Sequence, residues 1–150
     1  MRRFFITFDS IPIDKTSVKA GRNSPEVVTA CRCVNVGLFV SGSLRQDVII
    51  SLALGAKEDL KVVSFPGNSL KRVSPDERSI SFFLLKAIEK VQILEFGDSF
   101  IMNNGIELAR ASLDELLELW GHEVIQVPLV SPERFILETN LSADRKENTP

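Results

Sequence analysis

The feature that most constrains the fold is the alternation of strand-like and helix-like segments along the chain. Strand-like segments are short runs of β-branched and aromatic residues, whereas helix-like segments repeat apolar residues with a period close to 3.6. We expect strands at 3–8, 47–54, 61–65, 99–102, 106–108, 124–127 and 135–137, and helices at 25–40, 75–91 and 113–120. This order predicts an α/β fold with a mostly parallel sheet flanked by helices.

Polar residues set the expected boundaries of these elements. Ser24, Ser74 and Ser112 are the expected N-caps of the three helices, because each precedes an acidic first turn. Ser41-Gly42 is expected to end the first helix, and 9–23 to form a loop. We expect one α/β domain over 1–138 and a polar tail over 139–150.

The sheet order also predicts where a ligand binds. In parallel sheets, ligands lie at the carboxyl ends of the strands. The site is therefore expected in the loops that follow strands, namely 9–23, 55–59, 66–75 and the segment from 138 onward.

Composition excludes several classes of protein. The 18 basic and 20 acidic side chains leave a net charge of −2, so any contact with nucleic acid must come from a local patch. No apolar run reaches the length of a membrane span, and no metal-ligand spacing is present, so neither a membrane segment nor a metal site is expected. Cys31 and Cys33 are too close for an unstrained disulfide, which favours packing in a reducing cytosol.

Two polar clusters could carry function. The first is 41–47, where Arg45 and Asp47 precede a buried strand and could equally form a surface ion pair. The second is 70–78, where Arg72 and Arg78 surround an expected helix start whose backbone N–H groups suit phosphate. Ordinary helix capping with solvated charges is the alternative for this cluster.

These clusters belong to a set of strings that resembles the archaeal-type tRNA pseudouridine(54) N1-methyltransferases, members of the SPOUT, or α/β-knot, superfamily. The strings are Met-Arg-Arg-Phe at 1–4, Gly-Arg at 21–22, Cys-Arg-Cys-Val-Asn at 31–35, Ser-Gly-Ser-Leu-Arg-Gln-Asp-Val at 41–48 and Pro-Asp-Glu-Arg-Ser at 75–79. The fourth is similar to the family's Ser-His-Gly-Ile-Arg-x-Asp-Val. The resemblance covers roughly 1–90 and weakens over 105–120.

The resemblance implies methyl transfer from S-adenosylmethionine to N1 of a pseudouridine in the tRNA T-loop. A base must accept the N1 proton, and Asp47 or Asp76 is the candidate. The expected RNA contacts are Arg22, Arg45, Arg72 and Arg78. Ile136 and Leu137 match the start of the family's cofactor loop and are the expected cofactor contacts.

The chain departs from the family pattern near its C-terminus. Glu-Thr-Asn at 138–140 stands where the family has Gly-Asp-His, and the sequence ends at Pro150, before the family's remaining strand, knot loop and final helix. The resemblance therefore predicts an incomplete knot and an incomplete cofactor pocket. It also implies a cytoplasmic homodimer, since knot enzymes usually share their site between subunits.

Two alternatives to the enzyme follow from these departures. The chain could be a catalytically degenerate relative that binds RNA or a protein partner without methyl transfer. It could also be a purely structural or protein-binding module, which would have affinity for neither cofactor nor tRNA.

Overall fold

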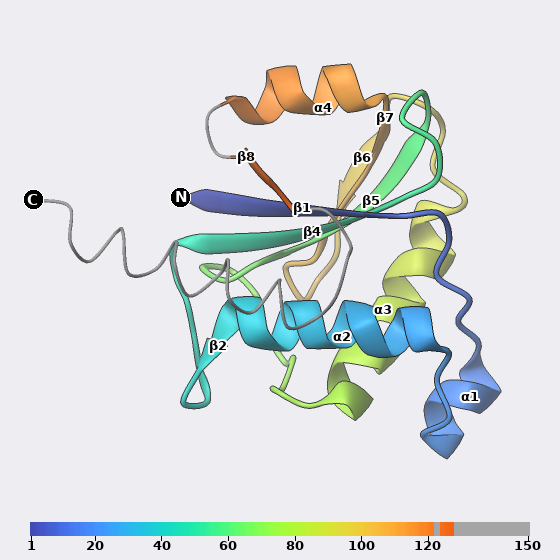
Figure 1. The fold of residues 1–150 in the computed structure, drawn as a ribbon, viewed down its shortest axis with the longest axis vertical. Helices are drawn as coiled ribbons and strands as arrows, with labels where there is room; N and C mark the ends of the chain where they lie inside the picture. Colours follow the sequence, from blue (N-terminus) through green and yellow to red (C-terminus); the bar gives the residue numbers. More distant parts are fainter. Residues whose placement is uncertain (122–123, 128–150) are drawn as a thin grey trace, which may run out of the picture.

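The computed structural model describes residues 1–121 and 124–127, which form a six-stranded sheet with helices on both faces and a separate two-stranded hairpin (Figure 1). Its elements are β1 (Arg2–Phe8), α1 (Lys15–Ala20), α2 (Pro25–Leu38), β2 (Phe39–Val40), β3 (Ser43–Leu44), β4 (Val48–Leu54), β5 (Leu60–Pro66), α3 (Glu77–Val91), β6 (Ser99–Ile101), β7 (Glu107–Ala111), α4 (Leu113–Trp120) and β8 (Val124–Val127). The expected strand at 135–137 and the tail at 139–150 lie outside the described residues. None of the helices in the described part combines the length and apolar character needed to cross a membrane.

The main sheet is mixed, which corrects the expectation of a mostly parallel one. Its order is β6-β7-β5-β4-β1-β8. β1 pairs in parallel with β4 and with β8, whereas β4–β5, β5–β7 and β6–β7 are antiparallel. The reason is the connection at 55–59, because a parallel return needs a crossover of about a dozen residues or more. Five residues allow β5 only to turn back beside β4.

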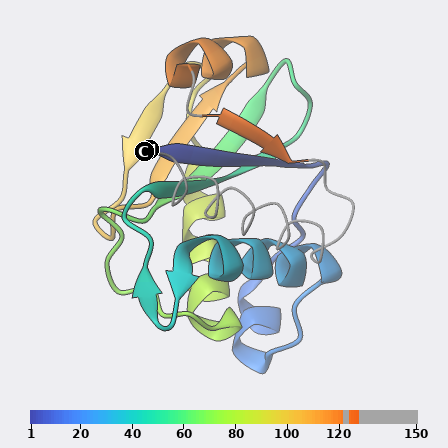
Figure 2. The same ribbon diagram turned by 60° about the vertical axis from the view of Figure 1, so that its left-hand side comes forward.

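Each face of the sheet has its own core, as period-2 alternation requires. α2 and α3 cover one face and α4 the other (Figure 1 and Figure 2). Phe4 and Ile6 belong to the larger core beneath α2 and α3. Phe5 belongs to the smaller core, where it packs with Leu116 of α4 and lies edge-on to Trp120 with ring centroids 5.7 Å apart.

A polar cluster lies inside the face covered by α4. The Arg3 side chain is 6% exposed and donates from Nη1 to Ser51 Oγ at 2.9 Å and to Ser64 Oγ at 3.2 Å. The two hydroxyls share a hydrogen bond of 2.7 Å across the β4–β5 pair. The guanidinium carbon lies 4.1 Å from the centroid of the Trp120 ring, a cation–π distance. Charge and hydrogen bonds thus join three strands to α4.

Local sequence explains two helix boundaries that differ from expectation. The segment 9–23 is not only a loop, because Asp14 caps the short helix α1 by accepting from Ser17 N at 2.8 Å. The first long helix ends at Leu38, and Ser41-Gly42 instead forms the turn of the β2–β3 hairpin, with φ of 51° and 82°. The prediction that Ser41-Gly42 directly ends the helix was therefore wrong.

Two of the three predicted N-caps are confirmed. Ser24 accepts from Val27 N at 3.3 Å, and Ser112 accepts from Glu115 N at 3.2 Å. The cap of α3 is Asp76 rather than Ser74, because the Asp76 carboxylate accepts from Ser79 N at 2.8 Å. α3 therefore begins two residues later than the expected start at 75.

Candidate functional site

Three of the five strings that carry the family resemblance meet at the last turns of α2. Asn35 Nδ2 donates to the carbonyl of Pro75 at 3.3 Å, which joins the string at 31–35 to the string at 75–79. Arg45 N donates to the carbonyl of Leu38 at 2.6 Å, which brings in the string at 41–48. Segments far apart in the sequence therefore meet at one end of α2.

Arg45 has a constrained backbone and a partly buried side chain. Its carbonyl oxygen lies so close to Gly67 that a Cβ at that glycine would overlap it, so the loop after β5 needs glycine at this point. The Arg45 Nε atom is buried and has no hydrogen-bond partner among the described residues. A buried N–H without a partner is costly, and an acceptor on a bound ligand would remove that cost.

Each of the two predicted proton acceptors has a structural partner. Asp47 Oδ2 lies 3.3 Å from Arg2 Nη2, and the Asp47 carbonyl accepts from Arg2 N at 2.8 Å. Arg2 is thus an ion-pair partner of Asp47. Asp76 is the N-cap of α3. A role for either carboxylate as the base stays a prediction.

The four predicted RNA contacts fall into two pairs. Arg22 and Arg78 share a corner where α1 meets α3. There Arg78 Nη2 donates to the carbonyl of Lys19 at 3.5 Å, and Asn23 Nδ2 donates to Glu77 Oε2 at 3.1 Å. Arg22 and Arg78 are both exposed.

The other pair is Arg45 and Arg72, at the two ends of the loop that follows β5. Gly67 contacts Arg45 at the start of this loop, and Lys71 N donates to the Asn104 carbonyl at 2.8 Å near its end. Arg72 is exposed and has a φ of 69°. Within 1–121 and 124–127, no hydrogen bond or ion pair joins Arg45 or Arg72 to the corner formed by α1 and α3.

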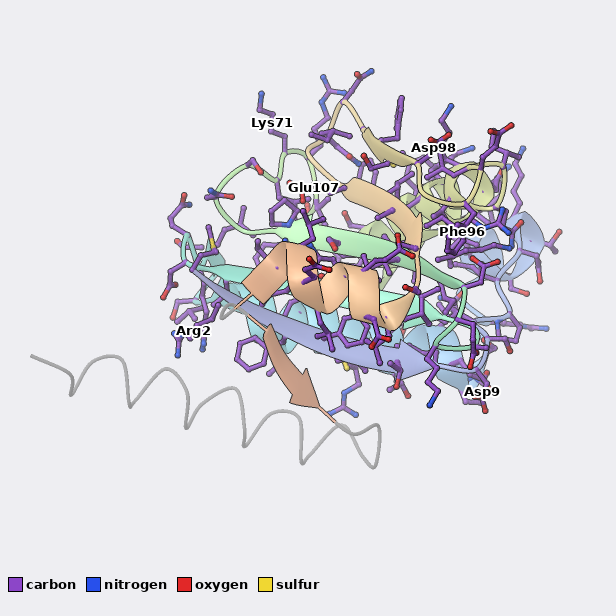
Figure 3. The ribbon with its side chains drawn as sticks, turned by 90° about the horizontal axis from the view of Figure 1, so that it is seen from above. Arg2, Asp9, Lys71, Phe96, Asp98 and Glu107 are labelled. Carbon is purple, nitrogen blue, oxygen red and sulfur yellow. The ribbon has the colours of Figure 1, made fainter. Side chains whose placement is uncertain are left out.

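The loops expected to hold a ligand lie at two opposite edges of the sheet. Figure 3 shows Arg2 and Asp9 at opposite ends of β1. The loops at 9–14 and 55–59 follow β1 and β4 at the carboxyl edge of these strands. Because β5 is antiparallel to β4, the segment 66–75 lies at the other edge, where β1 and β4 begin. The sequence expectation did not separate these edges.

The carboxyl edge of β1 and β4 carries two hollows. One has a volume of about 290 Å³ and combines apolar walls, such as Ile11 and Val91, with Asp9 and Lys61. The other, of about 520 Å³, lies beside it and includes Asp9 and Lys57. Volumes of this size are within the range of small-molecule sites, about 300–1,000 Å³, or close to it.

An ion pair fixes one wall of the smaller hollow. Arg110 donates to both carboxylate oxygens of Asp59, from Nε at 2.9 Å and from Nη2 at 2.8 Å. These hydrogen bonds hold the pKa of Asp59 below its usual value. Both carboxylate oxygens of Asp59 are therefore hydrogen-bonded to Arg110. The carboxylate of Asp9, which lines the same hollow, forms no hydrogen bond or ion pair with the described residues.

The two cysteines lie on α2 and are buried in the larger core. Burial raises the pKa of both Cys31 and Cys33 to about 12, so both thiols stay protonated at neutral pH. The interpretation of packing rather than redox chemistry is consistent with this. Among the described residues, no group of three His, Cys, Asp or Glu side chains could hold a metal ion. Ile136 and Leu137, the expected cofactor contacts, lie outside the described residues.

Comparison with known families decides the relationship of this chain. The model of a family described as "Putative SAM-dependent RNA methyltransferase" matches residues 4–129. The chain belongs to this family. The resemblance inferred from the strings at 1–79 is thereby confirmed.

Individual relatives share the archaeal enzyme name tRNA (pseudouridine(54)-N(1))-methyltransferase. A protein of Methanococcus maripaludis strain C5 is 52% identical over 61 residues, which are 40% of this chain and 31% of the relative. A protein of Methanococcus aeolicus is 39% identical over 88 residues, 58% of this chain and 42% of the relative. A protein of Haloferax volcanii is 38% identical over 96 residues, 60% of this chain and 45% of the relative. The matches thus span less than half the length of these relatives.

Sequence reasoning did not single out several residues that the structure brings together. Arg3, Ser51 and Ser64 are polar residues within otherwise apolar strands, and that irregularity was a usable signal. Lys86 and Lys90 lie one helical turn apart on the solvent side of α3, which the periodicity of this helix also predicts.

Proposed function

We propose that this protein is an S-adenosylmethionine-dependent methyltransferase that modifies N1 of pseudouridine 54 in tRNA. The family match over residues 4–129 carries the proposal, and the names of the archaeal relatives supply the substrate. The meeting of three family-like strings at the end of α2 supports it. We further propose that the whole protein has the α/β-knot fold and that it acts in the cytoplasm.

The RNA contacts we propose are Arg22, Arg45, Arg72 and Arg78. Arg45 has the most specific role, because contacts with Leu38 and Gly67 fix its backbone and its side chain is only partly exposed, whereas the exposed arginines pair with phosphates. Phosphate contacts position an RNA and carry no sequence information. Arg45 would therefore affect catalysis more than the others.

Asp47 or Asp76 would accept the proton that N1 loses. Asp47 is the stronger candidate, because it lies two residues from Arg45, whereas the Asp76 carboxylate is used in capping α3. Asp47→Asn would then reduce the methylation rate while leaving tRNA affinity unchanged. A base typically contributes about 10²–10⁴-fold to such a rate.

The cofactor fits the chemistry of the carboxyl edge of β1 and β4. Apolar side chains such as Ile11 suit an adenine, Asp9 can accept from ribose hydroxyls, and Lys57 or Lys61 can pair with the methionine carboxylate. Ile136 and Leu137 are the further contacts that we propose. S-adenosylmethionine would supply an electrophilic methyl group at this edge.

We also propose a homodimer, which the separation of the two edges supports. β1 has seven residues, so the edge near Arg45 and the edge near Asp9 are roughly 20 Å apart at about 3.3 Å per residue. Reacting atoms must approach to about 3–3.5 Å. Two protomers that pair opposite edges would join the RNA contacts of one to the cofactor site of the other.

Transfer of a labelled methyl group tests the function. The protein is incubated with methyl-labelled S-adenosylmethionine and tRNA carrying pseudouridine at position 54, with the uridine-54 transcript as control. We expect label only in the pseudouridine tRNA, because uridine has no N1–H. Binding of tRNA without label and without calorimetric binding of the cofactor would instead favour the degenerate RNA-binding relative.

Mixing variants tests the shared site. Arg45→Ala and Asp9→Ala proteins should each be inactive. In an equal mixture that exchanges subunits, about half of the dimers are mixed and each has one intact site of two, so the mixture should regain about a quarter of the wild-type activity. Arg32→Ala, which removes an exposed arginine elsewhere on α2, is the control for loss of charge. An inactive mixture of exchanged subunits would refute sharing.

A further inference from the structure

A basic and aromatic hollow lies between α3 and the β6–β7 hairpin, and Arg72 of the segment 66–75 is part of its lining. Its volume is about 370 Å³, and Arg72, Lys86, Lys90, Phe83 and Phe100 form much of its wall. No carboxylate lines it. We call it the α3–hairpin hollow.

Helical spacing explains how α3 contributes. Phe83, Lys86 and Lys90 follow one another at intervals of three and four residues, so they share one face of the helix. The apolar residues Leu84 and Ile88 instead face the core. Two lysines and an aromatic ring are thereby presented along one line.

The hairpin contributes the opposite wall. Phe100 of β6 is 43% exposed, although it is a large apolar side chain. The turn is fixed because Asn104 Oδ1 accepts from Ile106 N at 3.2 Å and the Asn104 carbonyl accepts from Lys71 N at 2.8 Å. The second bond holds the segment that bears Arg72 against the hairpin. Figure 3 shows Lys71 pointing away from the molecule at this place.

Cations and rings are interleaved along this surface. Lys90 Nζ lies 4.6 Å from the centroid of the Phe100 ring, and Lys86 Nζ lies 5.8 Å from that of Phe82. Phe82 is 46% exposed and contacts Phe83 edge to face, with centroids 5.1 Å apart. Arg72, Lys86 and Lys90 form no ion pair with any residue in 1–121 or 124–127.

The surface continues toward the start of α3. Phe83 also lines a neighbouring hollow of about 380 Å³, together with Lys19, Arg78 and Phe82. Asp76 lines this second hollow as well, so the positive charge is strongest at the α3–hairpin end. The exposed Glu89 lies on α3 but lines neither hollow.

We propose that the α3–hairpin hollow binds unpaired nucleotides of an RNA. The proposal rests on the function proposed above in taking RNA as the partner, and it assigns Arg72, already proposed as an RNA contact, to this hollow. Lys86, Lys90 and Arg72 would contact successive phosphates, while a base stacks on the exposed part of the Phe100 ring. The amide of Asn103, which also lines the hollow, can bond to a base edge.

The chemistry favours a single strand over a duplex. Positively charged grooves with exposed aromatic rings bind single strands, because every unpaired base offers a π-face. In a duplex the bases are stacked inside the helix, so Phe100 would have no base to contact. With a net charge of −2 for the whole chain, attraction of a polyanion must also come from a local surface of this kind.

Fluorescence anisotropy with a short fluorescein-labelled single-stranded RNA tests the proposal, without cofactor and over a series of salt concentrations. Phe100→Ala should weaken binding by about 5- to 150-fold, the effect of losing one stacked base. Lys86→Ala/Lys90→Ala should reduce the slope of log K against log salt by about 1.4, since each phosphate contact on a single strand contributes about 0.7. The same RNA as a duplex should bind more weakly and be insensitive to Phe100→Ala.

Matched variants separate these effects from loss of fold or of charge. Phe96→Ala removes another ring, 51% exposed, that lines neither hollow, and Lys15→Ala/Arg32→Ala removes two exposed cations elsewhere. Both should bind the single strand like the wild type. Phe100→Trp keeps an aromatic face and should retain binding, which a mere packing defect at this position would not predict.

Three results would overturn the proposal: no binding of the single strand at low salt, equal affinity of the wild type and Phe100→Ala, or equal salt slopes of the wild type and Lys86→Ala/Lys90→Ala. Failure of the proposed methyl transfer is separate, because binding is read without cofactor. Single-strand binding through the hollow without methylation would refute only the enzyme. Methylation with unchanged binding in these variants would refute only the hollow.

Discussion

Replacing Leu116 by alanine tests how α4 sits on the sheet. Leu116 is 1% exposed and packs in the smaller core with Phe5, Leu60 and Val62. The substitution removes three methylene equivalents, a transfer loss of about 2.4 kcal/mol at roughly 0.8 kcal/mol each. The cavity left behind adds to this, so we expect a loss of about 3–4 kcal/mol in the free energy of unfolding. For a domain of this size, that lowers the melting temperature by roughly 6–16 °C.

Leu119 of the same helix provides the matched control, because it is 76% exposed. Leu119→Ala makes the same chemical change, and leucine and alanine are both good helix formers, so we expect a change within about 0.5 kcal/mol. Urea unfolding followed by circular dichroism measures both variants. Equal losses in the two, or a loss below about 1 kcal/mol at Leu116, would refute the orientation of α4.

Three further predictions concern capping, charge and thiols. Asp76→Ala should cost about 1 kcal/mol in urea unfolding, whereas Asp76→Asn can still cap α3 and should not; equal losses would contradict the assignment. The pKa of Asp59 is lowered in the folded state, so its ion pair with Arg110 stabilises the fold fully at pH values above 3.8, the ordinary pKa of an aspartate. This stabilisation is lost as the pH falls through the lower pKa of the folded state. The melting temperature of Asp59→Asn should thus vary less with pH in this acidic range, and parallel curves would argue against the pair. Cys31 and Cys33, with pKa values raised to about 12, should react with a thiol reagent at pH 8 far more slowly than in urea; comparable rates would show them accessible.

Much of the secondary structure could be predicted, because apolar residues recur about every 3.6 positions in the helices and form short runs in the strands. The strand at Val124–Val127 has the expected bounds, β1 and β4 differ from expectation by one residue at one end, and β5 by one residue at each end. These strands are rich in β-branched and aromatic residues and contain no helix-like period, so strand was the favoured prediction. The short helix α1 was missed because its six residues offer too few turns for a pattern.

Strand direction required an argument about connections rather than composition. The alternation of strands and helices predicted a mostly parallel sheet. The apolar run of β4 could not correct this, because strands covered on both faces look alike whatever their direction. The five residues at 55–59 already favoured an antiparallel return, and this signal was available in the sequence. Because β5 was expected to be parallel to β4, the segment 66–75 was wrongly expected to lie beside the loops that follow β1 and β4.

The candidate site was only partly predictable, because side chains that meet across elements leave no local pattern. Arg45 was identified from a string, but the burial of its Nε atom and the close approach of Gly67 to its carbonyl leave no mark in that string. The capping role of Asp76 was hidden by Ser74, an equally good capping residue two positions earlier. The contact of Lys90 with Phe100 joins α3 to a hairpin, and only the folded chain brings them together.

The buried guanidinium of Arg3 has a consequence for how the sheet assembles. Apolar side chains of similar size would tolerate a shift of β5 along β4 by two residues, since the same faces would stay inward. Such a shift would move Ser64 away from Ser51 and leave hydroxyl and guanidinium groups facing aliphatic neighbours. A misaligned pairing would thus bury polar groups without hydrogen-bond partners. The few hydrogen bonds of this cluster therefore select the correct register, which hydrophobic packing alone would not specify.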